Sequence, residues 1–183
     1  MEKQNIVKYI TFSIVILITF AISLAVAYWK GVTSFLFAWI LNFMLMTAVL
    51  SFTQTFSPTL QSNYYQTKAW EKRGKIYRWM GVDFFRKLLV WTGWEKLNKT
   101  SKPVKKDMQA LITLERGTRE SEFGHLIIFF IVSAIALAVG WHHGVVNSAW
   151  LHLLNIILNV YPIALQRYNR PRLQQAISSM QRV

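Results

Sequence analysis

Four stretches of the chain carry no charged side chain and are long enough to cross a lipid bilayer. They are residues 9–29, 32–56, about 123–139 and about 145–165. An α-helix rises about 1.5 Å per residue, so about 20 residues cross a hydrocarbon core of about 30 Å. The pattern therefore predicts an all-α, polytopic membrane protein with four transmembrane helices.

Short turns join the predicted helices in pairs. Residues 30–31 separate the first two helices, and residues 140–144 separate the last two. Helices joined by such short turns run antiparallel. We expect an N-terminal transmembrane hairpin (1–56), a membrane-associated loop (57–122) and a C-terminal transmembrane hairpin with a basic tail (123–183). The alternative for the first stretch is a signal peptide, but it is too long for one and no small-residue cleavage site follows it.

Positive charges indicate on which side of the membrane each connection lies. Residues 57–122 hold fourteen Lys and Arg against seven acidic residues. The net charge of +13 also fits a nucleic-acid-binding protein, but here the charges flank the predicted spans. Lys and Arg near transmembrane helices concentrate on the cytoplasmic side. We therefore expect a multi-pass protein of the cell membrane, with both termini and this loop in the cytoplasm and no nucleic-acid partner.

The loop itself has a membrane-associated pattern. Residues 75–80 and 83–91 alternate basic with bulky apolar side chains at roughly helical spacing, which is typical of interfacial amphipathic helices. Residues 96–107, with Pro103, are expected to form a loop. Residues 108–122 are expected to form a helix that continues into the third span.

Glu122 and His125 are candidates for acid–base chemistry at the start of the third span. Residues three apart share a helix face, so Glu122 can orient the imidazole of His125. Two alternatives stay open: a buried ion-pair network that includes Arg119, and a pair of metal ligands. No further ligand with convincing spacing lies nearby, so we expect no metal. The chain has no cysteine, which excludes thiolate catalysis and thiolate metal sites.

Polar residues recur in the fourth span. His152, Asn155 and Asn159 follow each other at steps of three and four, in a stripe that continues toward Gln166. Hydrogen bonding between helices explains such a stripe, and so does a polar groove for a headgroup or sugar. Pro162 is expected to kink or loosen this helix.

Three arginines follow the fourth span within six residues: Arg167, Arg170 and Arg172. Anchoring by the positive-inside rule accounts for them. The alternative is an anion site, because a guanidinium group binds phosphate through two parallel hydrogen bonds.

Several of these segments together resemble the glycosyl-4,4'-diaponeurosporenoate acyltransferase family, the last enzymes of staphyloxanthin-type carotenoid synthesis. The resemblance covers roughly the C-terminal two thirds of the chain, and the N-terminal hairpin carries no matching motif. It rests on QRYNRPRL at 166–173, on Asn159-Val160-Tyr161-Pro162, on Glu122-x-x-His125 after Thr118, and on Lys72-Arg73-Gly74-Lys75 followed by aromatic residues.

The resemblance implies transfer of a fatty acyl group to a sugar hydroxyl, in that family on a glucose esterified to a carotenoid acid. We expect a membrane glycolipid or glycosyl carotenoid as acceptor, an acyl thioester such as acyl-CoA as donor, and no other cofactor. Direct transfer is expected, with His125 as base and Glu122 holding its ring. The remaining candidates bind the donor's phosphates (Arg167, Arg170, Arg172) or hydrogen-bond to the sugar or thioester oxygen (Asn159, Gln166, Asn169).

Two other functions fit the same pattern. One is a non-catalytic membrane scaffold or lipid-binding subunit, whose basic loop recruits a partner or anionic lipid. The other is a small transporter, although the first hairpin shows no broken helix and the chain no inverted repeat.

Overall fold

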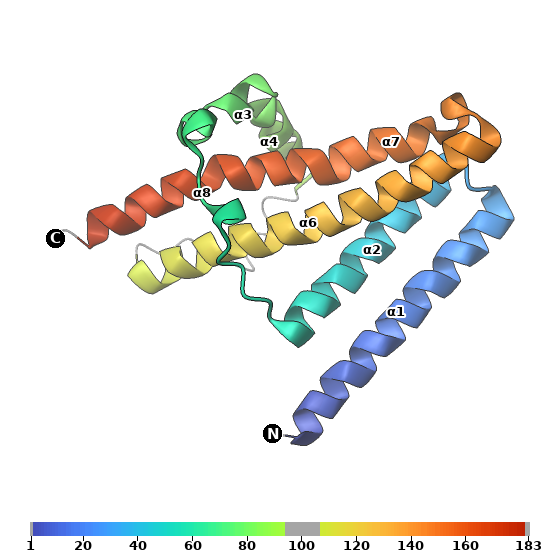
Figure 1. Ribbon diagram of the computed structural model, residues 1–183, viewed down its shortest axis with the longest axis horizontal. Helices are drawn as coiled ribbons and strands as arrows, with labels where there is room; N and C mark the ends of the chain where they lie inside the picture. The colour runs from blue at the N-terminus through green and yellow to red at the C-terminus, as the bar shows by residue number, and fades with distance from the viewer. Residues whose placement is uncertain (1, 94–106, 182–183) are drawn as a thin grey trace. The chain divides into compact units, whose positions relative to one another are not determined.

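The computed structural model describes residues 2–93 and 107–181, and within them the chain forms helices and turns but no β-strand. Four helical stretches are long and apolar enough to span a membrane (Figure 1). The all-α membrane fold expected from the sequence is thus confirmed. The four stretches are Asn5–Lys30, Phe35–Phe56, Met108–His143 and Val145–Met180.

Helix α6 (Met108–His143) is longer than the predicted third span. It is continuous, so residues 108–122 do lead into that span as one helix. The sequence predicted a turn at 140–144, but α6 continues to His143, so the turn is shorter than that. Gly144 follows with a φ of 91°, which glycine adopts without strain. The loop expected at 96–107 lies outside the described residues, apart from Asp107.

The chain divides into two compact units, each built from separate parts of the sequence. Unit 1 comprises Met1–Thr59 and Phe123–Val160, and unit 2 comprises Leu60–Glu122 and Tyr161–Val183. The basic tail therefore belongs to the same unit as most of the loop between the two hairpins.

In unit 1, α1 (Glu2–Lys30) and α2 (Phe35–Phe56) form an antiparallel hairpin (Figure 1). The hydroxyl of Ser34 caps α2 by accepting a hydrogen bond from the backbone N–H of Phe37 at 3.1 Å. The rings of Phe12 and Phe56 meet edge to face between the two helices, with centroids 5.4 Å apart. Only 6% of the most apolar window of α1 is buried, as expected for a helix surrounded by lipid.

Three helices supply the core of unit 1: α2, the C-terminal part of α6, and α7 (Ala149–Asn155), which a short 3₁₀ turn (η3, Val145–Ser148) precedes. After α7 the helix widens into one π-helical segment, η4 (Ile156–Val160), before α8 (Tyr161–Met180) begins. The irregularity expected at Pro162 thus lies just before that residue. The buried core side chains are Phe37, Ala38, Leu41, Ile128, Val132, Ala136, Val139, Leu151 and Leu154.

In unit 2, short elements pack along α8. They are η1 (Asn63–Tyr65), η2 (Ala69–Gly74), α3 (Ile76–Trp79) and α4 (Val82–Trp91). The amphipathic helices expected at 75–80 and 83–91 correspond to α3, which is a single turn, and to α4. The buried core consists of Tyr77, Val82, Ala164 and Tyr168.

Gly74 lets η2 approach the backbone of α8 closely. A Cβ atom at this position would lie 3.0 Å from the carbonyl oxygen of Tyr168, and the φ of 83° is itself unfavourable for other residues. The segment 72–75 can therefore pack closely on α8 because residue 74 is a glycine.

Candidate active site

His125 lies in unit 1 and contacts a buried amide. Its Nδ1 atom is 3.2 Å from Oδ1 of Asn159, and the histidine is half-buried while Asn159 is 1% exposed. Two of the residues expected at the site are therefore brought together, from α6 and from the π-helical segment η4. Segments of π-helix are rare and frequently occur at functional sites.

The amide of Asn159 is fixed by two other asparagines. Its Nδ2 donates to Oδ1 of Asn42 at 2.8 Å and to Oδ1 of Asn155 at 2.9 Å. Both of its N–H bonds are thereby used, which leaves Oδ1 as the atom directed at His125. We call these four residues, His125, Asn159, Asn155 and Asn42, the amide cluster.

The outer asparagines are fixed in turn. Asn42 donates to the carbonyl oxygen of Ala38 at 2.8 Å, and Asn155 donates to the carbonyl oxygen of Phe129 at 3.1 Å. Asn155 also donates to Oγ of Ser133 at 2.9 Å. Backbone carbonyl groups can only accept, so the donors and acceptors of the whole cluster run in one direction. His152, the first member of the expected polar stripe, is exposed and lies outside the cluster.

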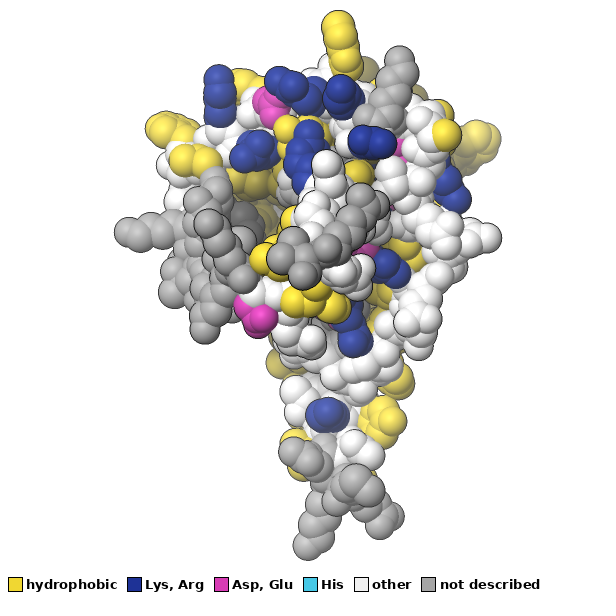
Figure 2. Space-filling view, turned by 90° about the vertical axis from the view of Figure 1, so that its left-hand side faces the viewer, with side chains coloured by type: hydrophobic (Ala, Val, Ile, Leu, Met, Phe, Trp, Pro, Cys, Tyr) yellow, Lys and Arg dark blue, Asp and Glu magenta, His cyan; other side chains and the backbone are white. Residues whose placement is uncertain are grey.

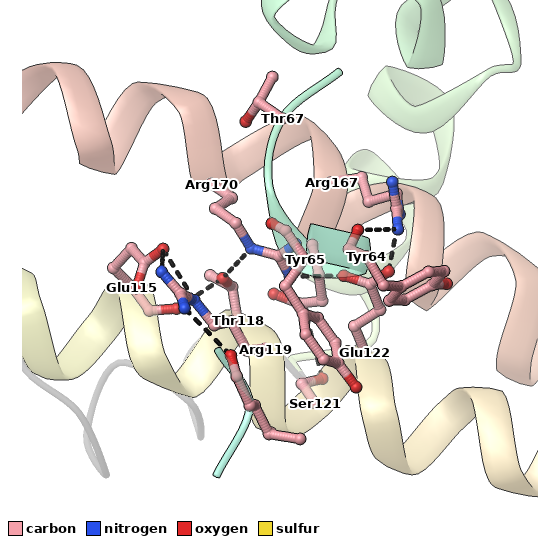
Figure 3. Close-up of polar contacts among 12 residues, drawn as sticks. Tyr64, Tyr65, Thr67, Glu115, Thr118, Arg119, Ser121, Glu122, Arg167 and Arg170 are labelled. Carbon is pink, nitrogen blue, oxygen red and sulfur yellow. Dashed lines mark hydrogen bonds and ion pairs between the residues drawn. The ribbon is translucent and has the colours of Figure 1, made fainter. Parts of the chain in front are cut away.

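Glu122 lies in unit 2 and is fully buried, at 0% exposure. Its Oε1 accepts from Nε of Arg167 at 2.6 Å, and its Oε2 accepts from Nη2 of Arg170 at 2.5 Å (Figure 3). The hydrogen bond expected between Glu122 and His125 is absent among the described residues. A carboxylate forms a stronger hydrogen bond with a charged guanidinium group than with a neutral imidazole. Glu122 therefore binds the two arginines rather than His125. Glu122 thus lies in the ion-pair network that the sequence left open as an alternative.

Arg167 joins Glu122 to a second buried carboxylate. Its Nη1 donates to Oε1 of Glu71 at 2.6 Å, and the hydroxyl of Tyr77 donates to the same oxygen at 2.6 Å. Burial acts to raise the pKa of Glu71, but hydrogen bonds from Tyr77, from the backbone N–H of Lys68 and from Arg167 outweigh it and lower that pKa. Burial and the neighbouring charge of Glu71 raise the pKa of Tyr77.

Arg170 is the most enclosed arginine of the chain's described part, with 2% exposure. Besides Glu122 it donates through Nε to Oγ1 of Thr118 at 3.0 Å and through Nη1 to the carbonyl oxygen of Tyr65 at 2.9 Å (Figure 3). Two arginines and two carboxylates, Arg167, Arg170, Glu71 and Glu122, balance one another in charge. We call these four residues the ion-pair network.

Arg119, expected to share a face with Glu122, has a different partner. Its Nη2 and Nε donate to Oε1 of Glu115 at 2.7 and 3.0 Å, and its Nη1 donates to the carbonyl oxygen of Leu60 at 3.0 Å (Figure 3). Gln174 on α8 donates to the same Glu115 oxygen at 3.0 Å. This second pair therefore ties the first turns of α6 to α8 within unit 2.

The remaining candidates are less enclosed. Arg172 is exposed and stacks on the ring of Tyr168, with the guanidinium carbon 3.6 Å from the ring centroid, and it also donates to the carbonyl oxygen of Tyr168. Gln166 donates to Oγ of Ser121 at 3.1 Å. Asn169 is half-buried, and none of the side-chain hydrogen bonds among the described residues involves it. Of the three arginines, Arg172 is thus the one whose guanidinium is not bound to a described carboxylate.

Sequence reasoning missed Asn42 and Glu71. Asn42 is an amide in the middle of the charge-free stretch 32–56, and a polar group at such depth is itself a signal for a buried contact or a functional site. Glu71 gave no local signal, because its arginine partner lies 96 residues further along the chain. The described residues contain no group of three or more His, Cys, Asp or Glu side chains placed to hold a metal ion.

A family model described as glycosyl-4,4'-diaponeurosporenoate acyltransferase matches residues 61–179. The matched region includes His125 and Asn159 of the amide cluster and all four residues of the ion-pair network, but not Asn42. No curated protein and no solved structure matches the chain.

Proposed function

The chain belongs to the glycosyl-4,4'-diaponeurosporenoate acyltransferase family and is thus an acyltransferase of carotenoid biosynthesis, and from this premise we propose that it uses His125 to transfer a fatty acyl group onto a sugar hydroxyl. The acceptor is a glycosylated carotenoid, and the donor is an acyl thioester such as acyl-CoA. The observation that carries the proposal is the contact of His125 with an amide whose orientation is fixed.

The amide cluster selects one tautomer of the neutral imidazole. Oδ1 of Asn159 can only accept a hydrogen bond, so the proton of neutral His125 resides on Nδ1. Nε2 then carries the free lone pair. A general base needs such a lone pair within reach of the hydroxyl proton that it removes. Asn159 therefore does for His125 what the sequence assigned to Glu122, with an uncharged group in place of a carboxylate.

The reaction follows from this arrangement. Nε2 of His125 removes the proton of the sugar hydroxyl while the hydroxyl oxygen attacks the thioester carbonyl carbon. The new carbon–oxygen bond forms and the carbon–sulfur bond breaks. The thiolate leaves and takes the proton from the imidazolium, which restores the base. A sugar ester and a free thiol are the products. The chain contains no cysteine, which is in keeping with direct transfer rather than an acyl-cysteine intermediate.

We assign the donor's phosphates to Arg172. Phosphate recognition needs a guanidinium group that is accessible, and Arg172 is exposed. A phosphate at Arg167 or Arg170 would compete with Glu122, which is already bound by both. Arg167 and Arg170 then serve to hold α8 against the segment from Tyr64 to Glu71. Gln166 and Asn169 stay candidates for hydrogen bonds to the sugar.

The test uses the purified protein in lipid nanodiscs, with acyl-CoA and a glycosyl carotenoid acid as substrates and the acylated product measured by mass spectrometry. His125→Ala should lower kcat by about a hundred-fold or more, the usual contribution of a general base. His152→Ala is the matched control, because that histidine is exposed and lies outside the amide cluster. A His125→Ala enzyme as active as the control would remove the base from the mechanism.

A further inference from the structure

Helix α4 has two apolar faces, and unit 2 covers one of them. Val82 and Phe85 are buried, and Phe85 stacks on Tyr161 with ring centroids 5.4 Å apart. Phe84, Leu88 and Trp91 follow each other at steps of four and three, so they share another face of the helix. On that face Phe84 is 72% and Trp91 86% exposed. We call these three side chains the apolar stripe.

A basic side chain, Lys87, adjoins the apolar stripe. Arg86 and Lys87 are both exposed, and because a helix turns about 100° per residue, Lys87 projects beside the stripe whereas Arg86 projects beside the packed face. Asp83, on the same side, pairs with Arg78 at 2.9 Å and also lies 3.9 Å from Nη1 of Arg86, so the two arginines share this carboxylate. Figure 2 shows Lys and Arg side chains gathered on one face of the protein, with hydrophobic side chains protruding beside them.

We propose that α4 docks unit 2 on an anionic lipid leaflet. The apolar stripe inserts at the boundary between headgroups and acyl chains, and Lys87 beside it meets the lipid phosphates. A helix with an apolar face and an adjoining basic side binds membrane surfaces through this combination of burial and charge attraction. The candidate spans of the same chain tether unit 2 to a bilayer, so docking requires no encounter from solution.

Charge favours the leaflet over a second copy of the chain. The chain carries a net charge of +13, and two α4 helices packed stripe to stripe would bring the basic sides of both copies together. Like charges facing each other across an interface oppose association. An anionic leaflet, by contrast, offers the complementary charge.

The experiment measures where single positions on α4 lie relative to lipid and water. The protein has no cysteine, so each of Phe84→Cys, Leu88→Cys, Trp91→Cys and Lys87→Cys carries one spin label. Labelled full-length protein is placed in nanodiscs of phosphatidylcholine with or without phosphatidylglycerol. Collision rates with oxygen, which partitions into lipid, and with a water-soluble nickel chelate are measured at each position.

Labels on the apolar stripe should show an oxygen-to-nickel collision ratio several-fold higher than the label at position 87. The difference should grow with phosphatidylglycerol and shrink in high salt, because salt screens the attraction. Stripe labels as accessible to nickel as the label at 87 would overturn the proposal. Labels that are immobile and shielded from both reagents would overturn it too, since they would indicate a covering protein. Neither result depends on acyl transfer.

Discussion

Nη2 of Arg170 lies 2.5 Å from Oε2 of Glu122, and both side chains are buried although they are 48 residues apart in the chain. A buried ion pair of this kind pays for its desolvation only when further hydrogen bonds satisfy both partners. Here Arg170 also bonds Thr118 and the carbonyl of Tyr65, and Glu122 also binds Arg167. Arg170 and Arg172, two positions apart in one motif, therefore have different predicted roles.

Arg-to-Lys substitutions should separate these two roles. Lysine in place of Arg170 cannot make the same three directed contacts, so Arg170→Lys should lower the stability of the protein by about 1–3 kcal/mol and leave KM for the donor unchanged. Arg172→Lys should keep stability and raise KM for the donor by about ten- to a hundred-fold, the value of a lost charge-assisted contact of about 1.5–3 kcal/mol. Thermal unfolding and donor titrations measure the two effects. An unchanged KM for the donor in Arg172→Lys would indicate that this residue serves only in membrane anchoring.

Asn42 should position the catalytic base without touching substrate. Asn42→Leu keeps the side-chain volume but removes the acceptor for Asn159, which frees that amide to rotate. We expect kcat to fall about tenfold, equivalent to about 1.4 kcal/mol, with KM for the donor unchanged and the pH–rate profile displaced. The control is Thr47→Val, which removes another polar group from α2, one that bonds only back to Phe43. Equal kcat values for the two variants would count against the role of Asn42.

Acid should weaken unit 2 through Glu71. Its pKa in the folded protein lies below the ordinary glutamate value of about 4.3, so the stabilisation that it contributes is complete above that pH and is lost as the pH falls through the folded-state pKa. The unfolding temperature of wild type should therefore exceed that of Glu71→Gln at pH 6, and the gap should close on acidification. Glu120→Gln serves as the control, because Glu120 belongs to an exposed pair worth at most about 1 kcal/mol. A difference in unfolding temperature that persists at the lowest pH would show that the charge of Glu71 does not stabilise unit 2.

Gly74→Ala should destabilise the packing of η2 on α8. Gly93 has a similar positive φ, 75° against 83°, but nothing lies within 4 Å of a Cβ built there. Gly93→Ala should thus lower the stability of the protein only through the strain of alanine in the left-handed conformation, by about 1–2 kcal/mol. Gly74→Ala should cost more, because its Cβ meets the backbone of Tyr168. Hydrogen exchange of the amides in α8 measures the difference, and equal protection in both variants would contradict the close approach.

The topology expected from the positive charges can be tested on whole cells. Gln61→Cys and His143→Cys place one thiol in the loop between the hairpins and one near the turn between the last two spans. An impermeant thiol reagent should label position 143 in intact cells and position 61 only after permeabilisation. Labelling of position 61 alone in intact cells would reverse the assignment.

The spans were predictable from sequence because the absence of charge over about 20 residues is a local property. The partners of the buried charges were not. Spacing placed Glu122 and His125 on one helix, as α6 has them, but it could not show that two arginines from α8 bind Glu122. The same limit applies to Asn42, whose amide contacts Asn159 across 117 residues. The π-helical segment η4 also had no signal beyond the nearby Pro162, since its hydrogen-bond register depends on tertiary packing.

The contact of Asn42 with Asn159 also bears on how members of this family can exchange parts. Asn42 belongs to the N-terminal hairpin, which the family model does not include, whereas Asn159 belongs to the matched region. A hairpin from another protein could therefore replace this one with few constraints on its lipid-facing side chains. The inherited requirements would be the apolar core contacts of Phe37, Ala38 and Leu41 and an acceptor atom opposite Asn159. Chimeras that supply an acceptor at the place of Asn42 should keep their kcat, and those that supply a methyl group there should lose about tenfold, as expected for Asn42→Leu.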